Sequence, residues 1–523
     1  MQMDDPIDFS LYLVTDRSLL AGKTYLETLE QALIGGVTVV QIREKDSDTA
    51  EFLQIAQESK AICDRYKVPL IINDRIDIAL AVDARGVHLG QSDMPINVAR
   101  KLMPEGSIIG ISCNSVDEVC RARESKADYV GLGSVWDTQT KRLTKVPIGV
   151  RGLGVMLEAL DGSEIKAVAI GGIKSTNLAR LIHGSWSHTS HGLDGVAVVS
   201  DIVAAPDPKK AAQLLKSTFI ACKKAALSFD RTSLWSRDEI LDKAITIMEG
   251  VRTLNPVIHQ ITNVVVSNQS ANITLALGAS PIMATAPEEM SDLAKLSGAL
   301  LINIGTLRAE SLEGMRKGGY YGNAAKKPVV LDPVGVGASD FRKSFVNELL
   351  NSWQPSVIKG NAGELAVLAG SSEAASRGVD STAGFKDPVS FVKQLARKER
   401  CIILLTGETD YISDGKRVFA LKNGHPLLGK ITGSGCMLGS CVASYCAAAN
   451  ILVKAVDIEG KLTRGGDFLS AAIGAVLTLT IASELAATRK DIGIGSFVSI
   501  LIDEVAALQP ETVRRLAKVE EIE

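Results

Sequence analysis

The sequence predicts an α/β protein of two domains, an N-terminal (β/α)8 TIM barrel and a C-terminal open α/β sheet. With 523 residues, the chain is longer than one hydrophobic core usually supports. Short runs rich in Val, Ile and Leu alternate with helical stretches from residue 11 to residue 227. The alternation resumes after residue 239 with different turns, so we expect a second α/β domain there.

Eight segments of the first domain have the continuous apolar runs of strands that are buried on both faces. They begin at Leu11, Thr38, Pro69, Gly86, Ile108, Tyr129, Lys166 and Gly195. Eight is the number at which parallel strands with intervening helices close into a barrel. We therefore expect a barrel over residues 1–228 that ends with a helix from Pro208 to Leu227.

The segment from Ser228 to Arg237 has neither helical nor strand periodicity, and we expect the domain boundary there. Beyond it, runs such as LLINIG, VVLDPVGVG and IILLTGE favour an open doubly wound sheet over residues 238–523. The apolar stretch from Ala471 to Ala487 is broken by Gly and Ser and contains Glu484. We expect it to be a buried helix rather than a membrane span.

Composition excludes several classes of function. A formal net charge of -3 without a basic run argues against a nucleic-acid partner, because phosphate neutralisation needs a basic excess. The eight cysteines form no C-x-x-C pair and no zinc-type spacing, so neither a disulfide frame nor a structural metal is indicated. The start, MQMDDPIDFS, lacks the apolar run of a secretory signal, and we expect a cytoplasmic protein.

Polar side chains gather at the carboxyl ends of the predicted barrel strands, which meet at one mouth. The second strand ends with Gln41, Arg43 and Lys45, and its two cations lie on one face, as a diphosphate would require. Asp74 after the third strand and Asp93 after the fourth would hold Mg2+ together with substrate phosphates.

Further groups suited to phosphate oxygens follow the remaining strands. They are Ser112, the loop residues Thr138, Thr140 and Lys141, the pair Gly171 and Gly172, and Val199 with Ser200. Loops after the seventh and eighth strands form the usual phosphate site of such barrels, where Gly lets backbone N–H groups approach the anion. The sequence therefore predicts a site for two phosphate-bearing ligands.

The motifs QIREK, IINDR, GVHLGQSD, TQTK, IGGI and VAVVSDI resemble thiamin phosphate synthase over nearly the whole first domain. The resemblance implies that hydroxymethylpyrimidine diphosphate and a thiazole phosphate are the substrates. It places the pyrimidine diphosphate on Gln41, Arg43, Lys45, Asn73, Ser112 and Lys141, Mg2+ on Asp74 and Asp93, and the thiazole phosphate on Thr138, Gln139, Thr140, Gly172, Val199 and Ser200. Arg43, Lys45 and Lys141 would act catalytically by stabilising the departing pyrophosphate.

In the second domain, ITGSGC precedes a long helix of small residues. Backbone N–H groups at such a helix start would form an anion hole for a phosphoryl group in transfer. Cys436 lies in the first turn, where a thiol pKa tends to fall, so it is expected to accept or orient the proton of an alcohol.

The run from Asn255 to Met290, followed by LDPVGVGA, GNAGE, LLTGE and NGHPLLGKITGSGC, resembles hydroxyethylthiazole kinase. The resemblance implies a ribokinase-like fold, ATP with Mg2+, and assembly into trimers, from which a hexamer could form. It places ATP on Lys359 and Thr406, and thiazole on Met283 and Gly433. Asp332 and Glu364 end predicted strands or begin helices, where they could organise Mg2+ through water. Together the two halves resemble the fungal bifunctional fusion of these enzymes.

Two alternatives remain open for the barrel. It could be a thiazole tautomerase, which would not need the diphosphate clamp, or a silent scaffold for the kinase. An inserted stretch, HGSWSHTSHGLDG, carries His188 and His191; we interpret it as a surface loop rather than a metal site.

Overall fold

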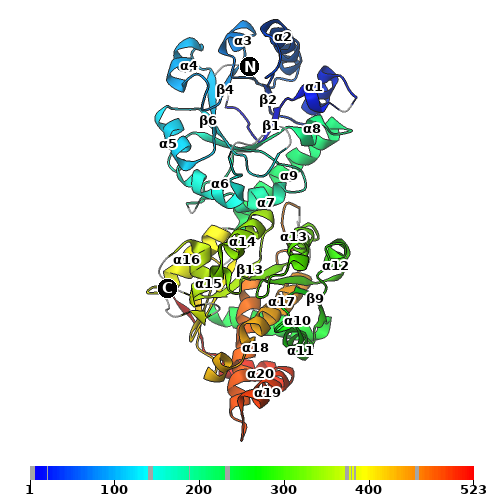
Figure 1. Cartoon of the computed structure of the whole chain (residues 1–523), viewed down its shortest axis with the longest axis vertical. Coiled ribbons are helices and arrows are strands. Elements are labelled where there is room, and N and C mark those ends of the chain that lie inside the picture. Colours follow the sequence, from blue (N-terminus) through cyan, green and yellow to red (C-terminus); the bar gives the residue numbers. More distant parts are fainter. Residues whose placement is uncertain are drawn as a thin grey trace. The chain divides into compact units, whose positions relative to one another are not determined.

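The computed structural model describes residues 6–20, 22–138, 145–187, 189–229, 236–371, 376–377, 380–381, 385–453 and 459–522. The chain divides into two compact units, residues 1–230 and 231–523, which Figure 1 shows in blue to green and in green to red.

Within its described residues, the first unit is a closed barrel of eight parallel strands in sequence order, so the predicted fold is confirmed. Each predicted strand corresponds to one observed strand. The strands are β1 Leu11–Val14, β2 Val39–Ile42, β3 Leu70–Asn73, β4 Gly86–Leu89, β5 Ile108–Cys113, β6 Tyr129–Leu132, β7 Lys166–Ile170 and β8 Gly195–Val198.

Helices follow the strands and surround the barrel (Figure 1). They are α1 Tyr25–Ile34, α2 Thr49–Arg65, α3 Ile76–Ala81, α4 Ile96–Leu102, α5 Val116–Glu124, α6 Gly149–Glu158, α7 Leu178–Gly184, α8 Ser200–Val203 and α9 Pro208–Phe229. Local sequence fixes several starts. Thr24 and Glu27 form a capping box at α1, while Asp48 and Ser115 accept a backbone N–H at the starts of α2 and α5.

The interior of the barrel has its own small core, separate from the larger core between the strands and the helices. Tyr12 and Tyr129 are its largest members, and both are buried. Gly110 makes room for one of them, because a Cβ at that position would lie 2.1 Å from Cζ of Tyr129. Any larger side chain at this point of β5 would displace the Tyr129 ring.

In the described part of the second unit, the strands of one nine-stranded sheet run in the order β10-β9-β11-β12-β13-β16-β17-β18-β19. The strands are β9 Val257–Ile261, β10 Ser280–Ile282, β11 Ala299–Asn303, β12 Val329–Asp332, β13 Val357–Asn361, β16 Ile402–Thr406, β17 Asp410–Ser413, β18 Val418–Leu421 and β19 Val519–Ile522. The first six in that order pair in parallel, whereas β17, β18 and β19 pair antiparallel with their neighbours. The antiparallel edge was not predicted; the connections around β17 are too short for a helical crossover and form hairpins.

Helices cover both faces of this sheet, as expected for a doubly wound fold. Along β11, Leu301 packs into the core on one face, while Leu300 and Ile302 pack into the core on the other. The helices are α10 Arg237–Leu254, α11 Ser267–Ala276, α12 Met290–Leu296, α13 Ala309–Ala324, α14 Asp340–Ser352, α15 Ala362–Ala369, α16 Pro388–Glu399, α17 Ser434–Leu452, α18 Phe468–Ala487, α19 Ile494–Ala507 and α20 Pro510–Leu516. Short strands β14 Ser376–Arg377 and β15 Asp380–Ser381 pair separately.

Two of these helices, α17 and α18, are long and apolar enough to cross a membrane by length and composition. In each, 83% of the most apolar window is buried within the protein, so both are core helices in this fold. The predicted buried helix at Ala471 to Ala487 is thereby confirmed, since it forms most of α18.

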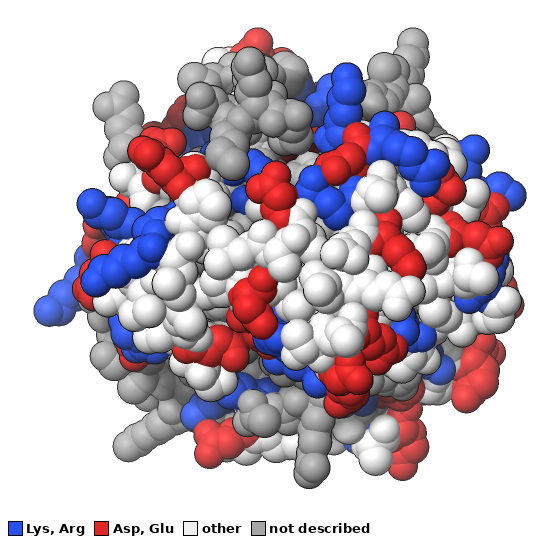
Figure 2. Space-filling model, turned by 90° about the horizontal axis from the view of Figure 1, so that it is seen from above, with Lys and Arg blue, Asp and Glu red and all other residues white. Residues whose placement is uncertain are grey.

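The face of the molecule seen in Figure 2 carries lysine and arginine side chains interspersed with aspartate and glutamate. Among the residues coloured there, neither sign of charge forms a continuous patch.

Candidate functional site

A cavity of about 500 Å³ is lined by residues at the carboxyl ends of the barrel strands. It brings together predicted site residues from seven strands, β2 to β8. Those lining it are Gln41, Arg43, Lys45, Asn73, Asp74, Asp93, Ser112, Thr138, Gly172, Val199 and Ser200. The other predicted residues, Gln139, Thr140 and Lys141, lie outside the described residues.

Two carboxylates and a lysine meet at one side of this cavity. Nζ of Lys45 forms an ion pair with Asp74, and the N–H of Gly90 donates to Oδ2 of Asp93 over 2.7 Å. Burial and the neighbouring Asp93 raise the pKa of Asp74. For Asp93, burial is outweighed by hydrogen bonds from Asp74 and Gly90, which lower its pKa. The two adjacent carboxylates thus have pKa values shifted in opposite directions, as expected for two negative groups that repel each other. A hard divalent cation bound between them would relieve this repulsion.

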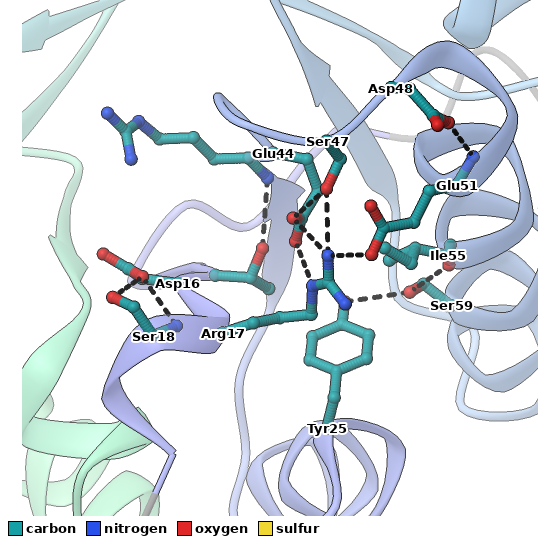
Figure 3. Close-up of polar contacts among 12 residues, drawn as sticks. Asp16, Arg17, Ser18, Tyr25, Glu44, Ser47, Asp48, Glu51, Ile55 and Ser59 are labelled. Atoms are coloured by element: carbon teal, nitrogen blue, oxygen red, sulfur yellow. Dashed lines mark hydrogen bonds and ion pairs between the residues drawn. The ribbon is translucent and has the colours of Figure 1, made fainter.

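Arg17 forms hydrogen bonds with residues of the segment that carries Arg43 and Lys45, and with the helix that follows it (Figure 3). The Arg17 guanidinium donates to Oε1 of Glu44 over 3.0 Å, to Ser47 over 2.9 Å and to Glu51 over 2.7 Å. These three acceptors converge on one side chain, so the turn after β2 is braced. Because neighbouring residues alternate in direction along an extended chain, Arg43 and Lys45 are left to line the cavity.

The opposite side of the cavity is formed by the turns after β7 and β8. Gly171 and Gly172 have φ values of 102° and 68°, a conformation that glycine adopts without strain. A Cβ on Gly172 would lie 2.7 Å from the carbonyl oxygen of Asp137, so the backbone can approach closely only without a side chain. This arrangement leaves the cavity a backbone-lined end suited to a phosphate.

Sequence reasoning missed three residues of the cavity floor, namely Tyr12, His88 and Tyr129. Tyr12 and His88 lie within strands and Tyr129 is the first residue of its strand, whereas the predicted polar residues lie at the carboxyl ends of strands. The alternation of side chains along each strand would have placed them inside the barrel.

In the second unit, the predicted anion hole lies at the start of α17. Gly433 has a φ of 84° and precedes the helix, whose first intrahelical bond runs from the N–H of Met437 to the carbonyl of Gly433 over 2.8 Å. The N–H groups of residues 434 to 436 therefore have no partner within the helix. Nζ of Lys359 lies 3.1 Å from the place that a Cβ of Gly435 would take, so a cation sits directly beside this turn.

Lys359 is buried and paired with the fully buried Asp332, with 3.0 Å between Nζ and Oδ1. Burial would lower the pKa of Lys359, but the charges of Asp332 and Glu364 outweigh it and raise that pKa. Burial raises the pKa of Asp332. Glu364 accepts the N–H groups of Gly335 and Asn361 over 3.0 and 2.9 Å.

Cys436 lies next to this pair, and the expected lowering of its pKa is wrong. Burial and the charge of Asp332 raise the pKa of the thiol, and they outweigh the charge of Lys359, which would lower it. Two asparagines that sequence reasoning missed donate to its sulfur. Nδ2 of Asn303 lies 3.2 Å and Nδ2 of Asn263 lies 3.5 Å from Sγ. Asn303 is the last residue of β11 and Asn263 follows the end of β9 by two residues, so their position after predicted strands was a signal available in the sequence.

The other predicted residues of this unit lie at strand ends. Thr406 is the last residue of β16 and pairs with Asn361 at the end of β13. Met283 directly follows β10, and both residues are partly exposed.

The histidine-bearing insertion forms no metal cluster in the part of the chain that the structure describes. Nδ1 of His191 lies 3.3 Å from Oδ1 of Asp161, and His188 lies outside the described residues.

Comparison with known proteins agrees with the geometry of both units. Residues 11–202 match the family model of thiamine monophosphate synthase, and residues 248–511 match that of the hydroxyethylthiazole kinase family. The chain is 39% identical to a probable thiamine biosynthetic bifunctional enzyme of Schizosaccharomyces pombe, with 98% of this chain and 97% of that protein covered.

Two further relatives show the same division. Identity to the thiamine biosynthetic bifunctional enzyme of Saccharomyces cerevisiae is 36%, covering 96% of each chain. A hydroxyethylthiazole kinase of Histophilus somni is 44% identical and covers 51% of this chain and 96% of its own length. The chain therefore belongs to the family of thiamine biosynthetic bifunctional enzymes, with a thiamine monophosphate synthase barrel followed by a hydroxyethylthiazole kinase unit of ribokinase-like fold.

Proposed function

We propose that the barrel joins hydroxymethylpyrimidine diphosphate to thiazole phosphate, and that the second unit makes this thiazole phosphate from the thiazole alcohol and ATP. The observation that carries the proposal is the single cavity lined both by the group around Arg43, Lys45 and Asp74 and by the glycine turn at Gly172. Two phosphate-bearing ligands would be held at its two sides. A tautomerase of thiazole phosphate would need only the second side, so the diphosphate clamp favours the synthase.

In the condensation, the bond between the pyrimidine methylene carbon and the diphosphate oxygen breaks, and its electron pair leaves with pyrophosphate. The thiazole nitrogen then donates its pair to form the new C–N bond. Arg43 and Lys45, with Lys141, stabilise the departing anion, and Gln41, Asn73 and Ser112 orient the pyrimidine. Thr138 to Thr140, Gly172, Val199 and Ser200 hold the thiazole phosphate.

Asp74 and Asp93 would hold Mg2+, which supplies charge neutralisation to the leaving diphosphate when bound. Their adjacency and divided pKa values support this assignment. Lys45, paired with Asp74, would be released to the diphosphate as the cation binds.

In the kinase reaction, the alcohol oxygen attacks the γ-phosphorus of ATP, the bond to the β-phosphate oxygen breaks to release ADP, and the alcohol proton passes to an oxygen of the transferred phosphoryl group and then to solvent. The N–H groups at the start of α17 and Lys359 face the developing charge. Cys436, kept protonated by its raised pKa, orients the alcohol rather than acting as a strong base. Met283 and Gly433 would contact the thiazole, and Thr406 the nucleotide.

Asp332 and Glu364 have their oxygens engaged by Lys359, Asn303 and backbone N–H groups. We therefore assign them to Mg2+ through water rather than by direct ligation.

A Gly433→Ala variant is expected to lower the kinase rate by about tenfold or more while the condensation rate stays unchanged. The residue has a positive φ, and a Cβ would lie 2.6 Å from Cγ1 of Val266. The turn that aims the N–H groups would have to shift. Steady-state kinetics of both reactions on the same preparation provide the measurement, and Gly429→Ala, where a Cβ meets nothing within 4 Å, is the matched control.

The proposed function is tested with the full chain, Mg2+, pyrimidine diphosphate and the thiazole alcohol, following thiamin phosphate. With ATP present, product is expected from the alcohol. Without ATP, product is expected only when thiazole phosphate replaces the alcohol. Product from neither thiazole would contradict the synthase assignment and leave the scaffold alternative.

We further propose a cytoplasmic homo-oligomer built on kinase trimers, which could pair into a hexamer. Val264 and Val265 support an interface beside α11, because these two apolar residues are 51% and 62% exposed. Sedimentation equilibrium of the full chain would give the mass, and a monomer at micromolar concentration would contradict the assembly.

A further inference from the structure

Five side chains from five strands form one hydrogen-bonded chain across the floor of the barrel cavity. Nε2 of Gln41 lies 2.9 Å from the hydroxyl of Tyr12, which lies 2.8 Å from the hydroxyl of Tyr129. That hydroxyl lies 2.9 Å from Nδ1 of His88, and Nε2 of His88 lies 2.9 Å from Oγ of Ser112. Both ends of the chain, Gln41 and Ser112, line the cavity.

The chemistry of its members gives this chain one direction. An amide nitrogen only donates, so the oxygen of Tyr12 accepts from Gln41 and its own proton goes to Tyr129. The proton of Tyr129 then goes to Nδ1 of His88, which must be unprotonated. A neutral imidazole in that state carries its proton on Nε2 and donates it to Ser112.

With Nε2 of Gln41 directed at Tyr12, other proton arrangements leave a buried proton without an acceptor among these five side chains. If His88 carried protons on both nitrogens, Tyr129 would accept from Tyr12 and from His88, and its own proton would find no acceptor among the five. If Nδ1 alone were protonated, the same conflict would arise at Tyr129. Tyr12 and Tyr129 are 2% and 0% exposed, so water cannot easily relieve it.

The surrounding backbone is adapted to this arrangement. Tyr12 and Tyr129 come from β1 and β6, which are not neighbours in the barrel, so their contact spans its interior. Gly110 leaves the space for the Tyr129 ring, and a Cβ on Gly131 would lie 3.1 Å from Cε1 of His88. Burial raises the pKa of both tyrosines, which keeps their hydroxyl protons in place.

We propose that Tyr12, Tyr129 and His88 are positioning residues whose directed hydrogen-bond chain makes Ser112 a donor, and Gln41 an acceptor through Oε1, toward the pyrimidine diphosphate. Because Oγ of Ser112 accepts the proton of Nε2 of His88, the Ser112 hydroxyl does not donate to His88 and can direct its own proton into the cavity. Diphosphate oxygens and pyrimidine ring nitrogens are acceptors, whereas the exocyclic amino group of an aminopyrimidine is a donor. The floor therefore selects a ligand that offers an acceptor to Ser112 and a donor to Gln41.

The direct test is the tautomer of His88 in the full chain without ligand. Nitrogen NMR of the protein labelled in histidine distinguishes the two ring nitrogens, and a His88→Gln variant assigns the signals among the six histidines. The expected result is an unprotonated Nδ1 and a protonated Nε2. A protonated Nδ1 would overturn the proposal, whatever the activity of the protein.

The functional test is the variant Tyr129→Phe, which removes the hydroxyl at the centre of the hydrogen-bond chain. The expected result is a fall of about fivefold or more in kcat/KM for pyrimidine diphosphate, with the KM for thiazole phosphate and the kinase rate unchanged. Tyr25→Phe is the matched control, because it removes a part-buried tyrosine hydroxyl bond, to Ser59 over 2.9 Å, outside the cavity. An equal loss in both variants would mean a merely structural effect and would contradict the proposal.

A second variant, Tyr12→Phe, tests whether the residues act as one hydrogen-bond chain. The double variant Tyr12→Phe with Tyr129→Phe is expected to lose no more than the single Tyr129→Phe, since either change interrupts the same path. Losses that multiply would overturn the idea of a single chain. The proposal rests on the proposed synthase function, but different results would contradict each. A wild-type protein that makes no thiamin phosphate would contradict the synthase function. A His88 protonated on Nδ1 would contradict only the hydrogen-bond chain.

Discussion

Replacement of Asp74 by Asn is expected to lower the rate of thiamin phosphate formation by ~100-fold or more while the kinase rate stays unchanged. Asp74 shares the cavity with Asp93 and is paired with Lys45, so the substitution removes one of the two carboxylates assigned to Mg2+. Asparagine is nearly the same size, and it tolerates the φ of 63° found at this position. The loss would therefore come from charge and not from backbone strain.

The Asp74→Asn substitution should lower the condensation rate without lowering the stability of the folded protein. The folded-state pKa of Asp74 is raised, so its contribution to stability is present only below the ordinary pKa near 3.8 and is lost as pH rises through the raised value. At neutral pH the ionised carboxylate therefore opposes folding, and asparagine removes that opposition. We expect the melting temperature of the ligand-free Asp74→Asn chain at pH 7 to equal or exceed that of the unchanged chain.

The measurements are steady-state rates as a function of Mg2+ concentration and thermal melting without metal. Asp83→Asn is a closely matched control, because Asp83 also has a positive φ, is exposed and does not line the cavity. An Asp74→Asn chain that condenses at the normal rate with unchanged Mg2+ dependence would refute the metal assignment. A lower melting temperature would refute the linkage argument.

The sequence was sufficient for the strands of the barrel and for the residues at their ends, because buried parallel strands are continuous apolar runs and their carboxyl ends share one mouth. Arg43 and Asp93 could be placed in one cavity from this rule alone. Side-chain alternation along β4 would also have placed His88 inside the barrel. Its hydrogen bond to Tyr129 could not be predicted, because the two residues come from strands that are not neighbours.

The error at Cys436 has a different origin. Its place in the first turn of a helix was read correctly, but a local rule about helix starts was applied to a thiol whose environment is set by long-range contacts. Asp332 and the burial of the site come from other strands, and they raise the pKa that the helix start would lower. Local sequence predicts where a group lies along its own element, whereas its electrostatics depend on what the fold packs against it.

The buried pair of Lys359 and Asp332 leads to the second large effect. A Lys359→Met variant is expected to lose roughly 3–5 kcal/mol of stability in the kinase unit, because it leaves the Asp332 carboxylate buried without its cation. Asn303 would remain as a donor to Oδ2, but a neutral amide does not balance a full charge. The kinase reaction should be lost as well, whereas condensation from added thiazole phosphate should persist in the barrel below the unfolding temperature.

A second substitution separates charge from packing. In the double variant Lys359→Met with Asp332→Leu, both charges are absent, so much of the lost stability is expected to return while the kinase stays inactive. Lys343→Met is the matched control, since Lys343 pairs with the exposed Asp340 over 3.1 Å and its removal should change stability by no more than ~1 kcal/mol. Denaturant unfolding of the four proteins gives the comparison. A Lys359→Met protein no less stable than the Lys343→Met protein would contradict this prediction. The ion pair of Lys359 and Asp332 would then not stabilise the kinase unit, and the electrostatic account of the site beside Gly435 would be wrong.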